Sequence, residues 1–315
     1  MRVETDIRTT MTPTSVSPRH ASALSDDSAR RSLLVHVVVW AIVLIAVGLP
    51  QIGVDLAGGS MPDWLPVADV AIVTGGLLVS VFWRPLRPFG RFLLVLLAMQ
   101  PAIHPGLWPV ALSSWRLGLP AAQPPLRAEF ILELAIVLAL VGVLVIFGLR
   151  PRQLYLRVGQ LDAFAAPVRW LIDRPIRWSR LGPVSAVLIG LGTFAFLVMG
   201  LGTPALIGVI AALPAILFFA ALNAFNEEVL FRAAPMGSLD GTMGRREAIL
   251  LGVALFAVPH YFGIPFGLVG MAMAAVLAWW LLKCLLETRG LFWPWTIHFV
   301  QDVLIFAVIT AGAGP

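Results

Sequence analysis

The segment NAFNEEVLFR, residues 223–232, places two adjacent carboxylates and an arginine inside one of the most apolar parts of the chain. An ionisable side chain at membrane depth costs about 3 kcal/mol on insertion scales, so such residues need a partner or a function. On a helix, Glu228 and Arg232 lie four positions apart on one face and can form an ion pair. Glu227 points about 100° away from Glu228 and has no local charge partner, which makes it the candidate general base.

Two later apolar stretches supply the remaining reactive side chains. FAVPH contains Phe256 and His260, and HFVQD contains His298 and Asp302. Each pair is four residues apart, so its members share one helical face. Hydrolysis of a peptide bond needs an activated water, a group that stabilises the oxyanion and a proton for the leaving amine. Together with Glu227, these side chains could supply all three.

The composition indicates which kind of structure must position these residues. Of the 315 residues, 59% are hydrophobic and 12% are charged, whereas a soluble domain is about half apolar and a quarter charged. Many runs approach the ~20 apolar residues that cross a bilayer. The fold class predicted is therefore an all-α polytopic membrane protein, with its catalytic helices in the C-terminal third. The single cysteine, Cys284, excludes an internal disulfide and a cysteine-cluster metal site.

The apolar runs predict about nine transmembrane helices. They lie near residues 33–50, 67–83, 90–112, 130–149, 182–200, 204–234, 247–262, 267–287 and 291–311. Pro101, Pro105 and Pro109 interrupt the third run, so the count is eight to nine. Pro235 is expected to end the sixth helix at about Ala234.

The chain divides into three predicted parts. Residues 1–30 form a polar, disordered cytosolic tail, since the first apolar run begins too late for a cleaved signal peptide. Residues 31–200 hold the N-terminal membrane helices and a basic cytoplasmic loop, 150–181. Residues 201–315 form the catalytic core. Within 150–181 the apolar residues have helical spacing, so that loop is either a helix lying on the membrane surface or a solvated positive loop.

The distribution of Lys and Arg between the spans predicts the orientation. The basic positions alternate consistently with a cytoplasmic N-terminus, and they include Arg30, Arg31, Arg84, Arg87, Arg91, Arg245, Arg246 and the seven arginines of the basic loop. We therefore expect an integral protein of the cell membrane. If the sixth helix ends near Ala234, Glu227 lies about 10 Å inside its cytoplasmic end. The positive charge sets topology and does not indicate binding of nucleic acid.

The three motifs EEVLFR, FAVPH and HFVQD resemble those of the CPBP family of intramembrane proteases, which includes CAAX prenyl proteases and bacteriocin-processing or self-immunity (Abi) proteins. In that family the motifs EExxxR, FxxxH and HxxxN or HxxxD each occupy one membrane helix. The resemblance covers about residues 220–310. Asp302 stands where many members have Asn, and Ala233 where Gly is frequent.

The resemblance implies an intramembrane endopeptidase of the CAAX type. A water activated by Glu227 would hydrolyse a peptide bond near the cytoplasmic face, assisted by His260, His298 and Asp302. Glu228 with Arg232 would hold the local geometry. The implied partners are the lipid bilayer and a peptide, or a prenylated or otherwise membrane-associated protein, as substrate.

Three other interpretations stay open at this point. In a zinc-dependent protease, His260, His298 and Glu227 would be the ligands, although the sequence lacks HExxH; no cofactor is the favoured expectation. A proton-coupled transporter would use the buried acids as a relay. A non-catalytic bacteriocin self-immunity protein would carry the motifs without activity. Elsewhere in the chain, the polar residues Asp69, Glu129, Glu133 and His104 are interpreted as packing or interface residues.

Overall fold

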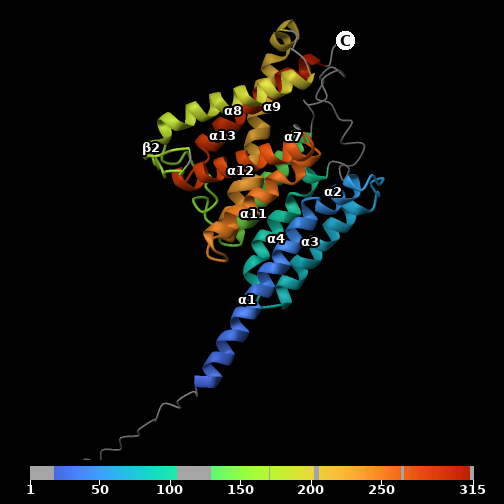
Figure 1. Cartoon of the computed structure of the whole chain (residues 1–315), viewed down its shortest axis with the longest axis vertical. Coiled ribbons are helices and arrows are strands. Elements are labelled where there is room, and N and C mark those ends of the chain that lie inside the picture. Colours follow the sequence, from blue (N-terminus) through green and yellow to red (C-terminus); the bar gives the residue numbers. More distant parts are fainter. Residues whose placement is uncertain (1–17, 105–128, 170, 202–205, 264–265, 313–315) are drawn as a thin grey trace, which may run out of the picture.

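The computed structural model describes residues 18–104, 129–169, 171–201, 206–263 and 266–312, and the chain in these ranges is mostly helical (Figure 1). The principal helices are α1 (Pro18–Ala46), α2 (Leu49–Leu56), α3 (Leu65–Phe82), α4 (Gly90–Ala98), α5 (Gln100–Ile103), α7 (Glu129–Ile146), α8 (Trp178–Leu201), α9 (Leu206–Glu228), α10 (Ala234–Leu239), α11 (Arg245–Ala257), α12 (Gly267–Thr288) and α13 (Phe292–Gly312). The helix α1 begins at Pro18, inside the segment predicted as a polar tail. Residues 1–17 of that tail lie outside the described residues.

The described residues contain five helices long and apolar enough to cross a membrane, or six if the bent pair α1–α2 counts as one. They are Leu65–Phe82, Trp178–Met199, Ile207–Leu239, Gly267–Thr288 and Phe292–Ile309, with Ser32–Ala46 and Leu49–Leu56 as the bent pair. The protein is a helical polytopic membrane protein, as predicted. The expected count of nine is not confirmed.

Local breaks explain why several predicted spans fail the length test. The first bends by 56° at Gly48, which has a φ of 90° that favours glycine. The third predicted span yields only the short α4 and α5, because Pro101 interrupts it; residues 105–112 of that prediction lie outside the described residues. The seventh yields α11, 13 residues long, followed by a single 3₁₀ turn, η4 (Pro259–Tyr261).

The sixth span does not end at Ala234, contrary to the prediction. After α9 the chain forms a π-helical turn, η3 (Val229–Ala233), and then continues as α10. A proline within an α-helix removes one hydrogen bond and clashes with the carbonyl four residues earlier. The wider π turn in front of Pro235 gives that ring room, so the apolar helix runs on to Leu239.

The basic loop forms a hairpin, and of the two alternatives left open for it the surface helix is wrong, because its described residues before Trp178 form no helix. Its two short strands, β1 (Phe164–Ala165) and β2 (Ile176–Arg177), pair antiparallel. The loop is fastened to the α12–α13 turn, where Gln160 N donates to Thr288 O at 2.7 Å. Gly159 has a φ of 86°, and a Cβ there would lie 2.8 Å from the Cα of Gly290, so both conformation and space require glycine.

Helix packing brings the three predicted motifs together. The helix α13 packs against both α8 and α9, and α12 packs against α11 (Figure 1). The first motif thus lies at the end of α9, the second at the end of α11 and the third on α13. One continuous set of buried apolar side chains joins α11 and α12 to the N-terminal helices α1, α3 and α4.

Candidate active site

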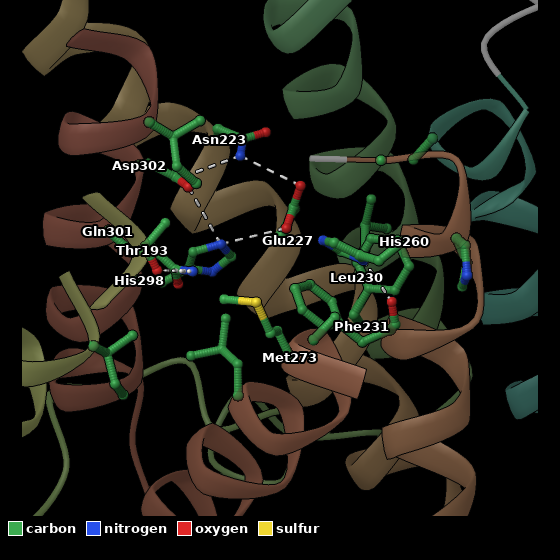
Figure 2. Close-up of a pocket in the computed structure, with 18 of the residues that line it drawn as sticks. Thr193, Asn223, Glu227, Leu230, Phe231, His260, Met273, His298, Gln301 and Asp302 are labelled. Carbon is green, nitrogen blue, oxygen red and sulfur yellow. Dashed lines mark hydrogen bonds and ion pairs between the residues drawn. The ribbon is translucent and has the colours of Figure 1, made fainter. Parts of the chain in front are cut away.

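Glu227 lies in the last turn of α9, directly before the π turn, and its side chain is 24% exposed. Asn223, one turn earlier, donates from Nδ2 to Glu227 Oε1 at 3.3 Å. His298 of α13 places its Nε2 3.4 Å from Glu227 Oε2. Figure 2 shows the two side chains pointing toward each other. The π turn that follows is a helix irregularity often found at functional sites. The carboxylate is therefore oriented by two polar side chains and still open on one side.

Asp302 lies one helical turn after His298 and closes a ring of polar contacts around Glu227. Asn223 Nδ2 donates to Asp302 Oδ2 at 3.0 Å, and His298 Nε2 lies 3.6 Å from Asp302 Oδ1. Asn223, His298 and Asp302 are all buried. Asn223 thus joins the two carboxylates, and His298 contacts both of them.

Glu228 and Arg232 form the ion pair that their spacing predicts, with Arg232 Nη1 2.7 Å from Glu228 Oε1. His298 Nδ1 lies 2.8 Å from the same oxygen. Both Glu228 and Arg232 are completely buried, and the Arg232 guanidinium stacks over the Phe256 ring at 4.0 Å. Breaking such a buried pair is strongly destabilising, so it holds α9, the π turn and α13 in register.

His260 stands in η4 and reaches the same cavity from a different side. Its Nδ1 lies 2.7 Å from the carbonyl oxygen of Phe256, which fixes the ring and leaves Nε2 for another partner. The centres of the His260 and Phe256 rings lie 4.3 Å apart, with the rings tilted by 40°. The Phe256 ring also meets the His298 ring edge to face, at 6.0 Å between their centres. The phenylalanine therefore spaces the two histidines without a direct bond between them.

The site opens into a cavity of about 800 Å³. Glu227, His260, His298 and Asp302 all line it, and most of the remaining wall is apolar. The apolar side chains come from α8 and α12 as well as from the motif helices, and they include Leu188, Ile189, Met273, Ala274 and Leu277. A largely apolar cavity with a few convergent polar groups is the usual form of a binding site.

Sequence reasoning missed several residues of this cavity. Asn223 was given no role, and its bridge between Glu227 and Asp302 depends on the placement of α13. Gln301 and Thr193 also line the cavity, and Gln301 Nε2 donates to Thr193 Oγ1 at 3.1 Å. Glu133 of α7 lines it too, although it was interpreted as a packing residue. Only helix packing, which sequence spacing does not encode, brings these residues together.

A zinc site formed by His260, His298 and Glu227 does not match the observed arrangement. His298 Nδ1 lies 2.8 Å from Glu228 Oε1, and its Nε2 lies 3.4 Å from Glu227 Oε2. Within the described ranges, no three side chains of His, Cys, Asp or Glu are grouped so that they could hold a metal ion. We therefore derive no step through a metal.

Comparison with known proteins shows which protein family the segment with these motifs resembles. Residues 209–304 match the family model described as type II CAAX prenyl endopeptidase Rce1-like. The match includes all three motifs and confirms the resemblance to the CPBP and CAAX proteases. No curated protein and no solved structure matches the chain. All the described helices from α1 to α8 lie outside the matched segment.

Proposed function

We propose that this integral membrane protein is a CAAX-type intramembrane endopeptidase in which Glu227 activates the hydrolytic water. The family match supports the class of enzyme. The observation that carries the choice of residue is the accessibility of Glu227. It is the part-exposed carboxylate of the polar ring, whereas Glu228 and Asp302 are buried behind it.

The proposed reaction begins with a water bound in the cavity beside the Glu227 carboxylate. Glu227 takes a proton from the water as the oxygen attacks the peptide carbonyl carbon, and it then delivers that proton to the leaving amine. His298 and His260 line the same cavity and can hydrogen-bond the water or the developing oxyanion. Asp302 and Asn223 orient Glu227 and His298, and the Glu228–Arg232 pair keeps the helices in place.

The substrate that this site fits is a membrane-associated protein or peptide. The apolar wall favours a segment with apolar side chains or an attached lipid, and a prenylated C-terminus is one such substrate. The test is comparative peptidomics of cells that produce either the natural protein or Glu227→Gln. The glutamine keeps size and hydrogen bonding but cannot act as a base. Cleavage products present with the natural chain and absent with the variant are expected; equal products from both would overturn the proposal.

We also propose that the protein lies in the cell membrane with its N-terminus and active site facing the cytoplasm. The basic segments support this orientation. A cysteine in place of Ser60 should react with an impermeant thiol reagent outside intact cells, whereas one in place of Asp173 should not. Cys284 is completely buried and gives a low background. Labelling of only the Asp173→Cys variant would reverse the orientation.

A further inference from the structure

Three arginines gather at a second cavity, far along the chain from the catalytic motifs. Arg84, Arg87 and Arg91, with Pro88 and Thr242, line a cavity of about 420 Å³. Arg84 follows the end of α3, Arg87 is the first residue of the short 3₁₀ turn η1 (Arg87–Phe89), and Arg91 lies in the first turn of α4. Thr242 follows α10, which packs against α4. Helix packing therefore forms the wall of this open depression from two distant segments.

Two of the guanidinium groups are held in place by backbone oxygens. Arg87 Nη2 donates to Val81 O at 2.9 Å, and Arg91 Nη2 donates to Phe147 O at 2.7 Å. A guanidinium has five N–H donors and no acceptor, so each retains donors for another partner. Within the described part of the chain, none of the three arginines forms an ion pair with a carboxylate. Like charges gathered without a counter-charge favour an anion.

The cavity lies just beyond the end of α3, and this position shows the depth in the membrane at which the cavity lies. The apolar helix α3 ends at Phe82, whose side chain is 83% exposed, as expected for a side chain that faces lipid. Arg84 follows two residues later. The arginines thus lie where the hydrocarbon region gives way to the headgroups, at the end of α3 that the sequence predicts to be cytoplasmic.

We infer that this cavity is a binding site for a phosphate group, supplied by the headgroup of an anionic lipid. The planar fork of arginine matches the oxygens of a phosphate, and basic pockets between membrane helices on the cytoplasmic side suit anionic headgroups. The need for positive charge in a cytoplasmic loop explains why arginines occur here. It does not explain why three of them line one cavity with Thr242 from another segment.

Occupation of this site would stabilise the junction of α3, α4 and the α10–α11 turn. A ligand that binds only the folded state raises stability with its concentration. The full chain, purified in an uncharged detergent, is titrated with short-chain phosphatidylglycerol, with phosphatidylcholine or with inorganic phosphate. Thermal unfolding and native mass spectrometry then report stabilisation and bound lipid. Phosphatidylglycerol should raise the unfolding temperature, and phosphatidylcholine should raise it less.

The variant Arg84→Gln/Arg87→Gln should bind phosphatidylglycerol about tenfold more weakly or worse, equivalent to 1.4 kcal/mol. The control, Arg169→Gln/Arg174→Gln, removes the same charge from exposed positions of the basic loop and should bind normally. If the double variant does not fold, Arg84→Gln alone provides the test. Inorganic phosphate that acts as well as the lipid, with the same dependence on Arg84, would assign the site to free phosphate. Equal binding by the variant and the natural chain, or equal loss in the control, would overturn the inference.

Discussion

Two clusters of polar side chains in this protein each contain a carboxylate, a histidine and an amide. At the candidate active site these are Glu227, His298 and Asn223. In the N-terminal helices, Asp69 of α3 is hydrogen-bonded by Gln51 of α2, and its Oδ2 lies 3.2 Å from Nε2 of the third member, His104. The clusters differ in access, since Glu227 is 24% exposed and lines the large cavity, whereas Asp69 is 1% exposed.

This difference shows that the types of residue alone do not make a reactive site. Within the cluster around Asp69, the oxygens Asp69 Oδ1 and Gln51 Oε1 have no hydrogen-bond partner among the described residues. Such orphaned groups cost free energy, yet a substrate cannot reach them. The cluster around Asp69 therefore joins α2, α3 and the end of α5, which matches the packing role predicted for Asp69. The cluster around Glu227 combines orientation with an open side.

The largest expected effect is on the rate of peptide cleavage, and it distinguishes Glu227 from Asp69. Glu227→Gln should lower the rate of peptide cleavage by about 10² to 10⁴, the usual contribution of a general base. Asp69→Asn makes the matching change, from carboxylate to amide, in the closed cluster. It keeps the shape of the Asp69 side chain and should leave the cleavage rate near that of the natural chain. Both are measured on the purified full chain with a substrate found by peptidomics. An equal loss in both variants would show that access does not distinguish the clusters.

The next effect concerns stability within the catalytic core. Arg232→Gln leaves Glu228 buried without its cation and should cost about 3–5 kcal/mol of unfolding free energy. The double variant Glu228→Gln/Arg232→Leu removes both charges and should lose less. Chemical unfolding in detergent gives the comparison. If the single variant is as stable as the natural chain, the pair does not hold the helices together.

A smaller effect is expected from Asp302, depending on what replaces it. Asp302→Asn keeps an oxygen that can accept the hydrogen bond from Asn223 and should keep substantial activity. Asp302→Ala leaves the buried Asn223 amide unpaired, which costs about 1–3 kcal/mol, and should lose much more. Steady-state rates of the two variants test this. Complete loss in both would mean that the position must carry a charge.

The smallest effect expected is that of a chelator. A reaction driven by Glu227 needs no metal ion, so dialysis against a strong chelator should leave the cleavage rate unchanged. Elemental analysis of the active preparation provides the control. About one zinc per chain, with activity lost on its removal and restored on its return, would replace the proposed mechanism.

The sequence predicted which polar side chains lie together around Glu227 better than it predicted the helices that carry them. The spacing of Glu228 and Arg232 correctly gave their ion pair, because an α-helix fixes which residues share a face. The bridge through Asn223 could not be predicted, since it depends on the contact between α9 and α13. The interruption of the third span at Pro101 was expected, but hydropathy does not show the bend at Gly48 or the early end of α11 at Ala257, so the count of nine is not confirmed. The hairpin at β1 and β2 forms from residues whose apolar spacing also fits a helix.

The π turn at Val229–Ala233 has a consequence for how positions along this span are counted. Each π turn holds one residue more than an α turn, and one residue corresponds to a rotation of about 100°. A helical wheel drawn through Ile207–Leu239 with a uniform 3.6-residue repeat would therefore assign α10 to the wrong side. When this span is aligned or redesigned by helical position, the positions after the π turn need to be shifted by one residue. The π turn thus lets Glu227 face the cavity while α10 packs on α4.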